Sequence, residues 1–157
     1  MTKEEDIQQE LTKNFNFLEG KISIPKVRRI FFGVPADKLE EVLKFLMDKI
    51  NFNILCTITG LDEGITLGMI YHLARKDGIV ISIKISVPKD NPIIKTITNY
   101  FPGAEYYERE IMDLFGAKVE GLPEGTRYPL PDGWPEGQYP LRKDWKSDML
   151  GKENNNG

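Results

Sequence analysis

Apolar and polar residues alternate in two neighbouring stretches of the chain. In residues 65–74 and 79–87, every second position is apolar (Leu67, Met69, Tyr71 and Leu73, then Ile79, Ile81, Ile83, Ile85 and Val87). A period of two predicts strands with one buried face. Residues 75–78 between them end in Asp-Gly, a dipeptide that favours a tight turn, so the two strands are predicted to form an antiparallel hairpin.

A helical period appears in two other stretches. In residues 36–50 the apolar side chains recur three or four positions apart, and residues 104–115 have a similar apolar face that ends at Gly116. Both patterns predict helices, the second with a glycine stop. Weaker patterns predict strands over 22–24, 27–34 and 52–59, a short helix around Ile7 and Leu11, and another over 93–100 after Pro92.

Together these elements predict an α+β fold, a two-layer α/β sandwich. Its sheet is mixed and largely antiparallel, contains the hairpin, and is covered by helices. The length of 157 residues fits one compact domain, predicted to span residues 1–116.

The composition changes after Gly116. Prolines and glycines recur at intervals too short for a helix or a central strand, yet the segment is rich in Tyr and Trp. Since disordered segments are poor in aromatic residues, residues 117–150 are predicted to form an extended arm that needs a surface. Either the arm folds back on its own domain or it docks on another protein, and the second alternative is favoured. Residues 151–157 are predicted to be disordered.

Charge and residue counts exclude several functions for this chain alone. The net charge of −3 gives no reason to expect nucleic-acid binding. The only cysteine, Cys56, is expected to be a small buried hydrophobe, and the only histidine, His72, lacks neighbouring ligands for a metal. The glycines do not form a phosphate-binding motif, and the apolar runs are too short to span a bilayer, so any membrane association is expected to be indirect.

One motif carries a family resemblance. Residues 106–116 read Tyr-Tyr-Glu-Arg-Glu-Ile-Met-Asp-Leu-Phe-Gly, which resembles the E-R-E-x-x-D-L-[FY]-G signature of the 30 kDa subunit family of respiratory complex I. Residues 131–134 and 139–145, Pro-Asp-Gly-Trp and Tyr-Pro-Leu-Arg-Lys-Asp-Trp, are similar to a second block of that family. The chain departs from the family at Leu122-Pro123, where a histidine often precedes the proline, and at Thr126-Arg127, where paired arginines are common.

The resemblance implies a structural subunit in the peripheral arm of a membrane-bound, ion-translocating redox complex. The short chain resembles most the small subunit of archaeal membrane-bound [NiFe] hydrogenases that evolve H2; a complex I-type NADH or ferredoxin:quinone oxidoreductase and a sulfur-reducing complex are the alternatives. The family further implies no cofactor in this chain, a hydrogenase-like large subunit of the 49 kDa type as partner, [NiFe] and iron–sulfur centres in the partners, and a peripheral position on the cytoplasmic face of the membrane.

The charged residues of the motif also allow a different interpretation. Glu108, Glu110 and Asp113 could serve a free-standing enzyme as general acid or base. Helical spacing instead favours ion pairs of Arg109 with Glu105 and with Asp113, and a third interpretation has these groups hold the arm or a partner loop. No catalytic residue is therefore predicted, and the predicted partner interface consists of Glu108, Arg109, Glu110, Asp113, Phe115, Gly116, Arg127, Tyr128, Trp134, Tyr139, Pro140, Leu141, Arg142, Lys143 and Trp145.

Overall fold

The computed structural model describes residues 1–151, and its contacts divide the chain into two compact units. The first unit comprises Met1–Ile58 and Met69–Ser86, and the second comprises Thr59–Gly68 and the described part of Val87–Gly157. The division predicted at residue 116 follows the change in composition, whereas the contacts group residues 104–115 and the arm (residues 117–150) in one unit. Residues 152–157 of the predicted disordered tail lie outside the described residues.

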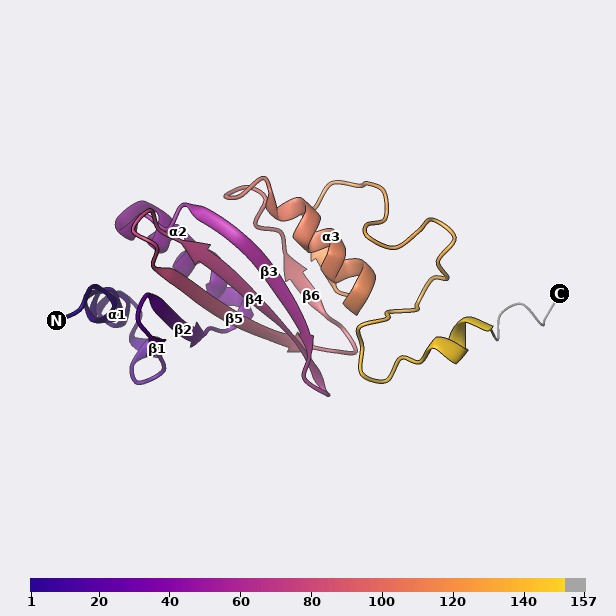
Figure 1. Ribbon diagram of the computed structural model, residues 1–157, viewed down its shortest axis with the longest axis horizontal. Coiled ribbons are helices and arrows are strands. Elements are labelled where there is room, and N and C mark those ends of the chain that lie inside the picture. Colours follow the sequence, from indigo (N-terminus) through magenta and orange to yellow (C-terminus); the bar gives the residue numbers. More distant parts are fainter. Residues whose placement is uncertain (152–157) are drawn as a thin grey trace. The chain divides into compact units, whose positions relative to one another are not determined.

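The main sheet has five strands in the order β1-β2-β5-β4-β3. Their bounds are Ser23–Lys26 (β1), Arg29–Gly33 (β2), Ile54–Asp62 (β3), Thr66–Ala74 (β4) and Val80–Pro88 (β5). β1 pairs with β2 in the antiparallel sense, while β2 pairs with β5 in parallel, with Ile30 opposite Ile81 and Phe32 opposite Ile83. One parallel pair in an otherwise antiparallel sheet makes the sheet mixed, as Figure 1 shows.

The turn between β1 and β2 depends on a charged residue in the left-handed region. Arg28 has a φ of 61°. Residues with a β-carbon rarely adopt this left-handed conformation, because the β-carbon crowds the backbone. Its backbone N–H donates to the Glu4 carboxylate from helix α1 (Lys3–Asn14). This hydrogen bond holds the turn and ties α1, which begins with a capping box between Thr2 and Glu5, to the sheet of the first unit.

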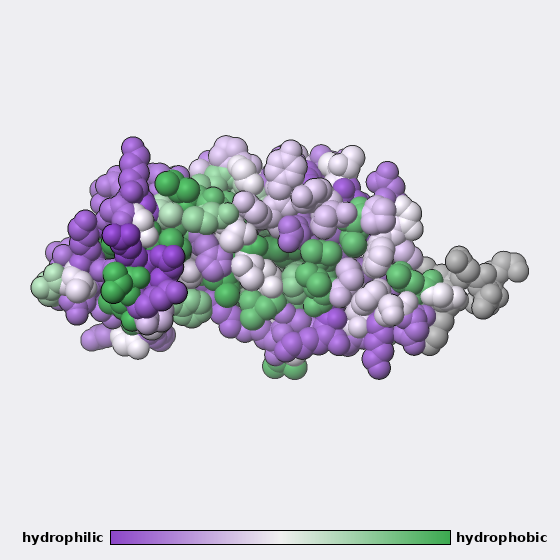
Figure 2. Space-filling model, in the orientation of Figure 1, coloured by the Kyte–Doolittle hydropathy of each residue, from purple (hydrophilic) through white to green (hydrophobic). Residues whose placement is uncertain are grey.

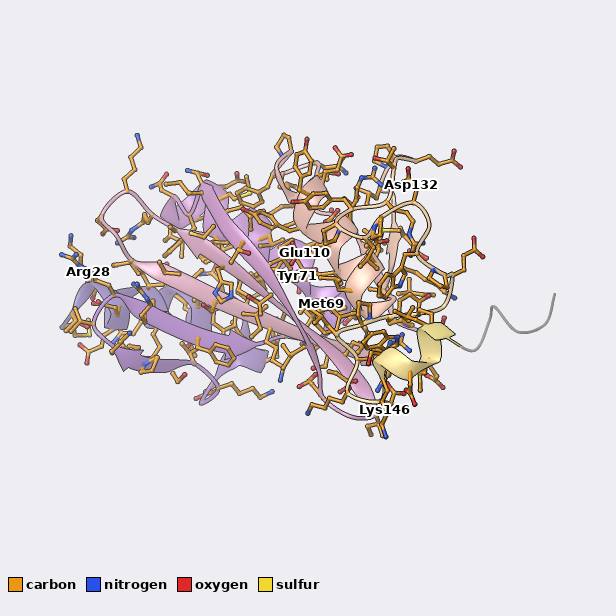
Figure 3. All side chains as sticks on the ribbon, turned by 45° about the vertical axis from the view of Figure 1, so that its right-hand side comes forward. Arg28, Met69, Tyr71, Glu110, Asp132 and Lys146 are labelled. Carbon is orange, nitrogen blue, oxygen red and sulfur yellow. The ribbon has the colours of Figure 1, made fainter. Side chains whose placement is uncertain are left out.

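Helix α2 supplies the apolar face that the sequence predicted for residues 36–50. A 3-10 turn, Ala36–Lys38, leads into α2 (Leu39–Ile50), which ends at Asn51 in the left-handed conformation. α2 lies behind the strands in Figures 1 and 3. Its Leu39, Val42, Leu43 and Leu46 are buried, as are alternate side chains of β4 and β5 in the same unit, namely Met69, Tyr71, Leu73, Ile81, Ile83 and Ile85.

The second unit is built around helix α3 (Ala104–Phe115) and a small parallel sheet. Strand β6 (Ile93–Lys95) pairs with β7 (Lys118–Glu120), so that Ile94 lies opposite Val119. The 3-10 helix η3, Ser147–Gly151, ends the described chain. Strand β7 lies between α3 and Pro123, the first proline of the arm. The arm therefore begins as a strand and becomes irregular beyond Glu120.

The structure confirms the α+β class, the largely antiparallel sheet and the hairpin. Arg75 N–H donates to Ile79 O, and Gly78 closes the turn with a φ of 85°. The predicted helix over 93–100 is wrong, because the β-branched residues of β6 find a ladder partner in β7 and Lys118 N–H donates to Pro92 O. Residues 27 and 28 form a turn instead of opening the second strand, and Cys56 is exposed on β3, at the edge of the sheet, instead of buried.

Leu46→Ala should test the core of the first unit. Leu46 is fully buried on α2, so its truncation should lower the free energy of unfolding by about 2–5 kcal/mol, through lost apolar burial and the cavity left behind. Urea denaturation followed by circular dichroism measures this change. Lys49→Ala, on the exposed side of the same helix, is the control and should stay within about 0.5 kcal/mol of the unaltered chain.

Candidate subunit interface

Helix α3 ends at a glycine that a larger residue cannot replace without displacing the arm. Gly116 has a φ of 77° and donates its N–H to Met112 O, a left-handed helix end. A β-carbon at this position would lie 2.5 Å from the ring of Tyr139. Phe115 is packed as closely in the same unit, since a β-carbon on Gly60 of β3 would lie 2.6 Å from its ring. At the Phe-Gly end of the motif, Phe115 therefore packs against strand β3 and Gly116 packs against Tyr139 of the arm.

Glu108, the first glutamate of the motif, is completely buried. Its carboxylate accepts hydrogen bonds from Thr96 Oγ1 and from Ile97 N–H, both at 2.7 Å. Burial raises the pKa of Glu108, although the two hydrogen bonds act in the opposite direction. Glu108 thus fixes the segment after β6 to α3, inside its own unit, and its oxygens already have protein donors.

Arg109 extends from α3 to the beginning of the arm. Its guanidinium pairs with Glu105 one turn earlier at 2.9 Å, as the helical spacing predicted, and also donates to Pro123 O at 2.6 Å. The arm passes so close that a β-carbon on Gly125 would lie 2.5 Å from the Arg109 guanidinium. A larger residue at position 125 would therefore require the Arg109 guanidinium to move.

Asp113 holds the next part of the arm. Its carboxylate accepts from Arg127 Nε at 3.4 Å and from Leu130 N–H at 3.1 Å. The ion pair predicted between Arg109 and Asp113 is replaced by the pair of Asp113 with Arg127, which lies fourteen residues further along the chain. Arg127 also donates to Trp134 O, which closes a loop of the arm upon itself.

The Tyr-Pro-Leu-Arg block returns the arm to the C-terminal end of α3. Leu141 N–H donates to Leu114 O at 3.0 Å, and Arg142 Nε donates to Phe115 O at 2.7 Å. The Arg142 guanidinium also lies over the Tyr139 ring, 4.7 Å from its centroid. These groups satisfy carbonyls at the helix end that have no partner within the helix.

Asp62, at the end of β3, binds the last part of the arm and was missed by the sequence reasoning. Its carboxylate accepts from Lys89 Nζ at 2.7 Å, Gly64 N–H at 2.9 Å and Lys143 N–H at 2.9 Å. Burial raises the pKa of Asp62, but these donors outweigh burial and lower the pKa to about 2. The sequence did not indicate this contact, because Asp62 is a single acid at the end of a strand and its partner Lys143 lies 81 residues away.

The two tryptophans of the arm pack on each other. Trp134 and Trp145 are half-buried, with ring centroids 5.9 Å apart. Both indole N–H groups donate to Gln138, one to its backbone oxygen and the other to its side-chain oxygen. The arm therefore folds back on its own unit, which was the less favoured alternative, while part of its aromatic surface remains open.

The predicted interface residues fall into two groups. Glu108, Arg109, Asp113, Phe115, Gly116, Arg127, Tyr139 and Arg142 all contact groups of the second unit. Tyr128 and Leu141 are exposed, as are Glu110 and Lys143, and Pro140, Trp134 and Trp145 are half-buried. Residues of the second group keep exposed side-chain surface although some of them also make contacts within the unit, while those of the first group are used mainly inside it.

Over residues 1–151, no group of three or more His, Cys, Asp or Glu side chains is arranged to hold a metal ion. In the same range, no helix has the length and apolar character that crossing a bilayer requires. The motif's buried carboxylates accept hydrogen bonds from backbone and side-chain donors of this chain.

This geometry defines a class of α+β proteins in which a charged helix holds a proline-rich C-terminal arm. Residues 32–149 match the family described as "Respiratory-chain NADH dehydrogenase, 30 Kd subunit". The chain belongs to this family, as the motif in α3 and the block at residues 139–145 predicted.

Similar proteins come from several redox complexes. A subunit of the F(420)H(2) dehydrogenase of Methanosarcina mazei is 33% identical over 89% of this chain and 90% of its own length. The membrane-bound hydrogenase subunit beta of Pyrococcus furiosus is 29% identical over 93% and 88%. A chain in the structure of the membrane-bound sulfane sulfur reductase, an archaeal respiratory membrane complex, matches with a TM-score of 0.84 at 28% identity, covering 98% of this chain and 92% of that one.

Substitution of Glu108 should separate its hydrogen bonds from its charge. Glu108→Ala leaves the buried Ile97 N–H unpaired and should lower the free energy of unfolding by about 1–3 kcal/mol. Glu108→Gln keeps an acceptor for that N–H and should cost far less. Thermal unfolding of the three proteins at neutral pH measures both effects, and equal losses for Ala and Gln would contradict the role assigned to the two hydrogen bonds.

The pH dependence of the same proteins has a defined sign. Because the folded pKa of Glu108 lies above the unfolded value of 4.5, the folded state binds more protons in the interval between them, and stability falls as pH rises through it. The Gln variant lacks this titration. The free energy of unfolding of the Gln variant should therefore rise relative to that of the unaltered chain from about pH 4.5 upward. A difference that does not change with pH would show that the pKa of Glu108 is not raised.

Asp62 should stabilise the protein with the opposite pH dependence. Its folded pKa of about 2 lies below the ordinary 3.8, so its contribution is present above pH 3.8 and is lost as pH falls towards 2. Asp62→Asn should lower the free energy of unfolding at pH 7 by about 2 kcal/mol or more, since charge-assisted hydrogen bonds are lost. The deficit should shrink between pH 4 and pH 2 in denaturant titrations. Asp90→Asn, at an exposed acid next to Lys89 in the sequence, is the control.

Proposed function

We propose that this chain is a non-catalytic structural subunit in the peripheral arm of a membrane-bound, ion-translocating redox complex, of the [NiFe] hydrogenase type that evolves H2. The observation that carries the proposal is the fixed arm. The Arg109 guanidinium holds it at Pro123, and carboxylates and a carbonyl of the second unit hold it at further points up to Lys143. Family membership and the named relatives, which are subunits of redox complexes, support it.

The fixed arm suits assembly because its ordering occurs within the chain. A free proline-rich segment would lose conformational freedom on docking, and each immobilised side chain would add to that cost. Here the hydrogen bonds to Asp62, Asp113 and Phe115 have already ordered it. Exposed Tyr128 and Leu141 and the open sides of the two tryptophans then provide a shaped surface for another subunit.

The proposed partner is a hydrogenase-like large subunit of the 49 kDa type. In this proposal the redox centres, nickel–iron and iron–sulfur, belong to partner subunits, and this chain holds no cofactor. Its place is the cytoplasmic face of the membrane, where it associates through its partners. The name of the Pyrococcus furiosus relative, a membrane-bound hydrogenase subunit, supports the choice of complex.

A sulfur-reducing complex is the second candidate. The structural match to a chain of the membrane-bound sulfane sulfur reductase covers 98% of this chain with a TM-score of 0.84, and this observation favours it. The two candidates differ in product, H2 in one and sulfide in the other. The arm and its contacts serve both equally, since the chemistry lies in other subunits.

Purification of the tagged chain from its native host tests the proposal. Gentle detergent extraction should yield a complex that contains a large subunit of the 49 kDa type, iron and nickel, and that evolves H2 from a low-potential electron donor. Sulfide production without nickel would select the second candidate. A tagged chain that purifies alone from membranes and cytosol would contradict both.

Trp134→Ala should lower the yield of that complex several-fold. The indole is half-buried and packs on Trp145, so its loss removes exposed aromatic surface and loosens the arm. The melting temperature of the isolated chain should change by no more than a few degrees, because the core of neither unit contains Trp134. Trp134→Phe is the matched control and should retain most of the yield; equal losses of yield and melting temperature would assign Trp134 to folding alone.

A further inference from the structure

Two exposed tyrosines meet where α3 and the arm lie side by side. Tyr106 on α3 is 65% exposed and Tyr128 on the arm is 45% exposed, and their rings are 5.8 Å apart at 73°, an edge-to-face pair. The residues that flank Tyr128 are fixed, since Arg127 and Leu130 both bind the Asp113 carboxylate. The pair is therefore held in position while about half of its surface faces water.

Two exposed acids lie near this pair in the sequence, Glu110 on α3 and Asp132 on the arm. Glu110 is one helical turn beyond Tyr106, hence on the same side of α3, and Asp132 is four residues beyond Tyr128. Figure 3 shows Glu110 on the helix and Asp132 on the arm. In residues 104–137, all described, the exposed acids that make no ion pair outnumber the single exposed lysine, Lys118; these acids are Glu110, Glu120, Glu124, Asp132 and Glu136.

We propose that the Tyr106–Tyr128 pair and its carboxylates, here called the tyrosine–acid surface, bind an arginine-bearing segment of the partner subunit. This inference rests on the proposed function and names the chemistry of one contact. A guanidinium stacks on an aromatic face and can donate to a carboxylate at the same time, which suits rings bordered by acids. Tyrosine and arginine also dominate the binding energy of protein interfaces.

Other occupants fit this surface less well. An apolar segment would bury the carboxylates without partners, which costs free energy. A nucleic acid or an anionic lipid surface would be repelled by the acids. The visible face in Figure 2 combines hydrophobic and strongly hydrophilic residues, a mixture that interfaces share with other protein surfaces, so the acids carry the distinction.

Photo-crosslinking in the assembled complex tests the inference directly. Replacing Tyr128 with p-benzoylphenylalanine should produce a crosslink to a partner peptide that contains an arginine within a few residues of the crosslinked site, identified by mass spectrometry. The same amino acid at Val27, which is 80% exposed in the first unit, is the control and should not give that peptide. A crosslink to a segment without arginine, or none, would overturn the inference.

Binding measurements with the full chain separate stacking from charge. Titrated into the purified complex that lacks this chain, Tyr128→Ala should raise Kd about tenfold, and Glu110→Gln a few-fold. Tyr128→Phe keeps the ring face and Glu19→Gln removes an exposed acid elsewhere, so both should stay within about twofold. Equal weakening by Phe and Ala, or no weakening by Ala, would contradict the proposed stacking. If the unaltered chain fails to bind, the proposed function fails; normal binding with no effect of Tyr128→Ala refutes only this inference.

Discussion

Over residues 121–140 the backbone of the arm cannot satisfy its hydrogen-bonding groups through a helix or a strand ladder, because a proline or a glycine recurs every few residues. The second unit supplies the missing partners. Asp113 accepts from Leu130 N–H, Asp62 accepts from Lys143 N–H, and Leu114 O accepts from Leu141 N–H. The path of the arm depends on these acceptors, and so does everything that the arm presents to a partner.

Two glycines allow the close approach that these hydrogen bonds require. Gly116 and Gly125 allow the Tyr139 ring and the Arg109 guanidinium to lie where a β-carbon would otherwise stand. The close approach brings Arg142 within reach of Phe115 O and the arm within reach of Arg109. Thus Arg109 and Asp113 of the motif in α3 hold the arm, and the terminal Gly116 makes room for it.

The sequence predicted the parts of the fold that local patterns determine. Alternation revealed the hairpin of β4 and β5, and the 3.6-residue period together with Gly116 revealed α3. The parallel pairing of β2 with β5 and the β6–β7 sheet escaped, since both join segments far apart in the chain, and the proline before Ile93 suggested a helix start. The exposure of Cys56 followed from the edge position of β3, which no local pattern encodes.

For the candidate interface, the residue types were informative and the partners were not. The acids and arginines of α3 were expected to bind the arm or a partner loop, and the structure shows Arg109 and Asp113 bound to the arm while Glu108 is enclosed by Thr96 and Ile97. No motif or periodicity in the sequence marked Thr96 and Ile97 as the partners of Glu108. Once these groups are assigned to internal contacts, the residues left for recognition are the ones that nothing inside the chain uses. They are exposed aromatic rings and acids on α3 and the arm, where we propose that a partner binds, so the most distinctive motif shapes the surface while less distinctive residues remain exposed on it.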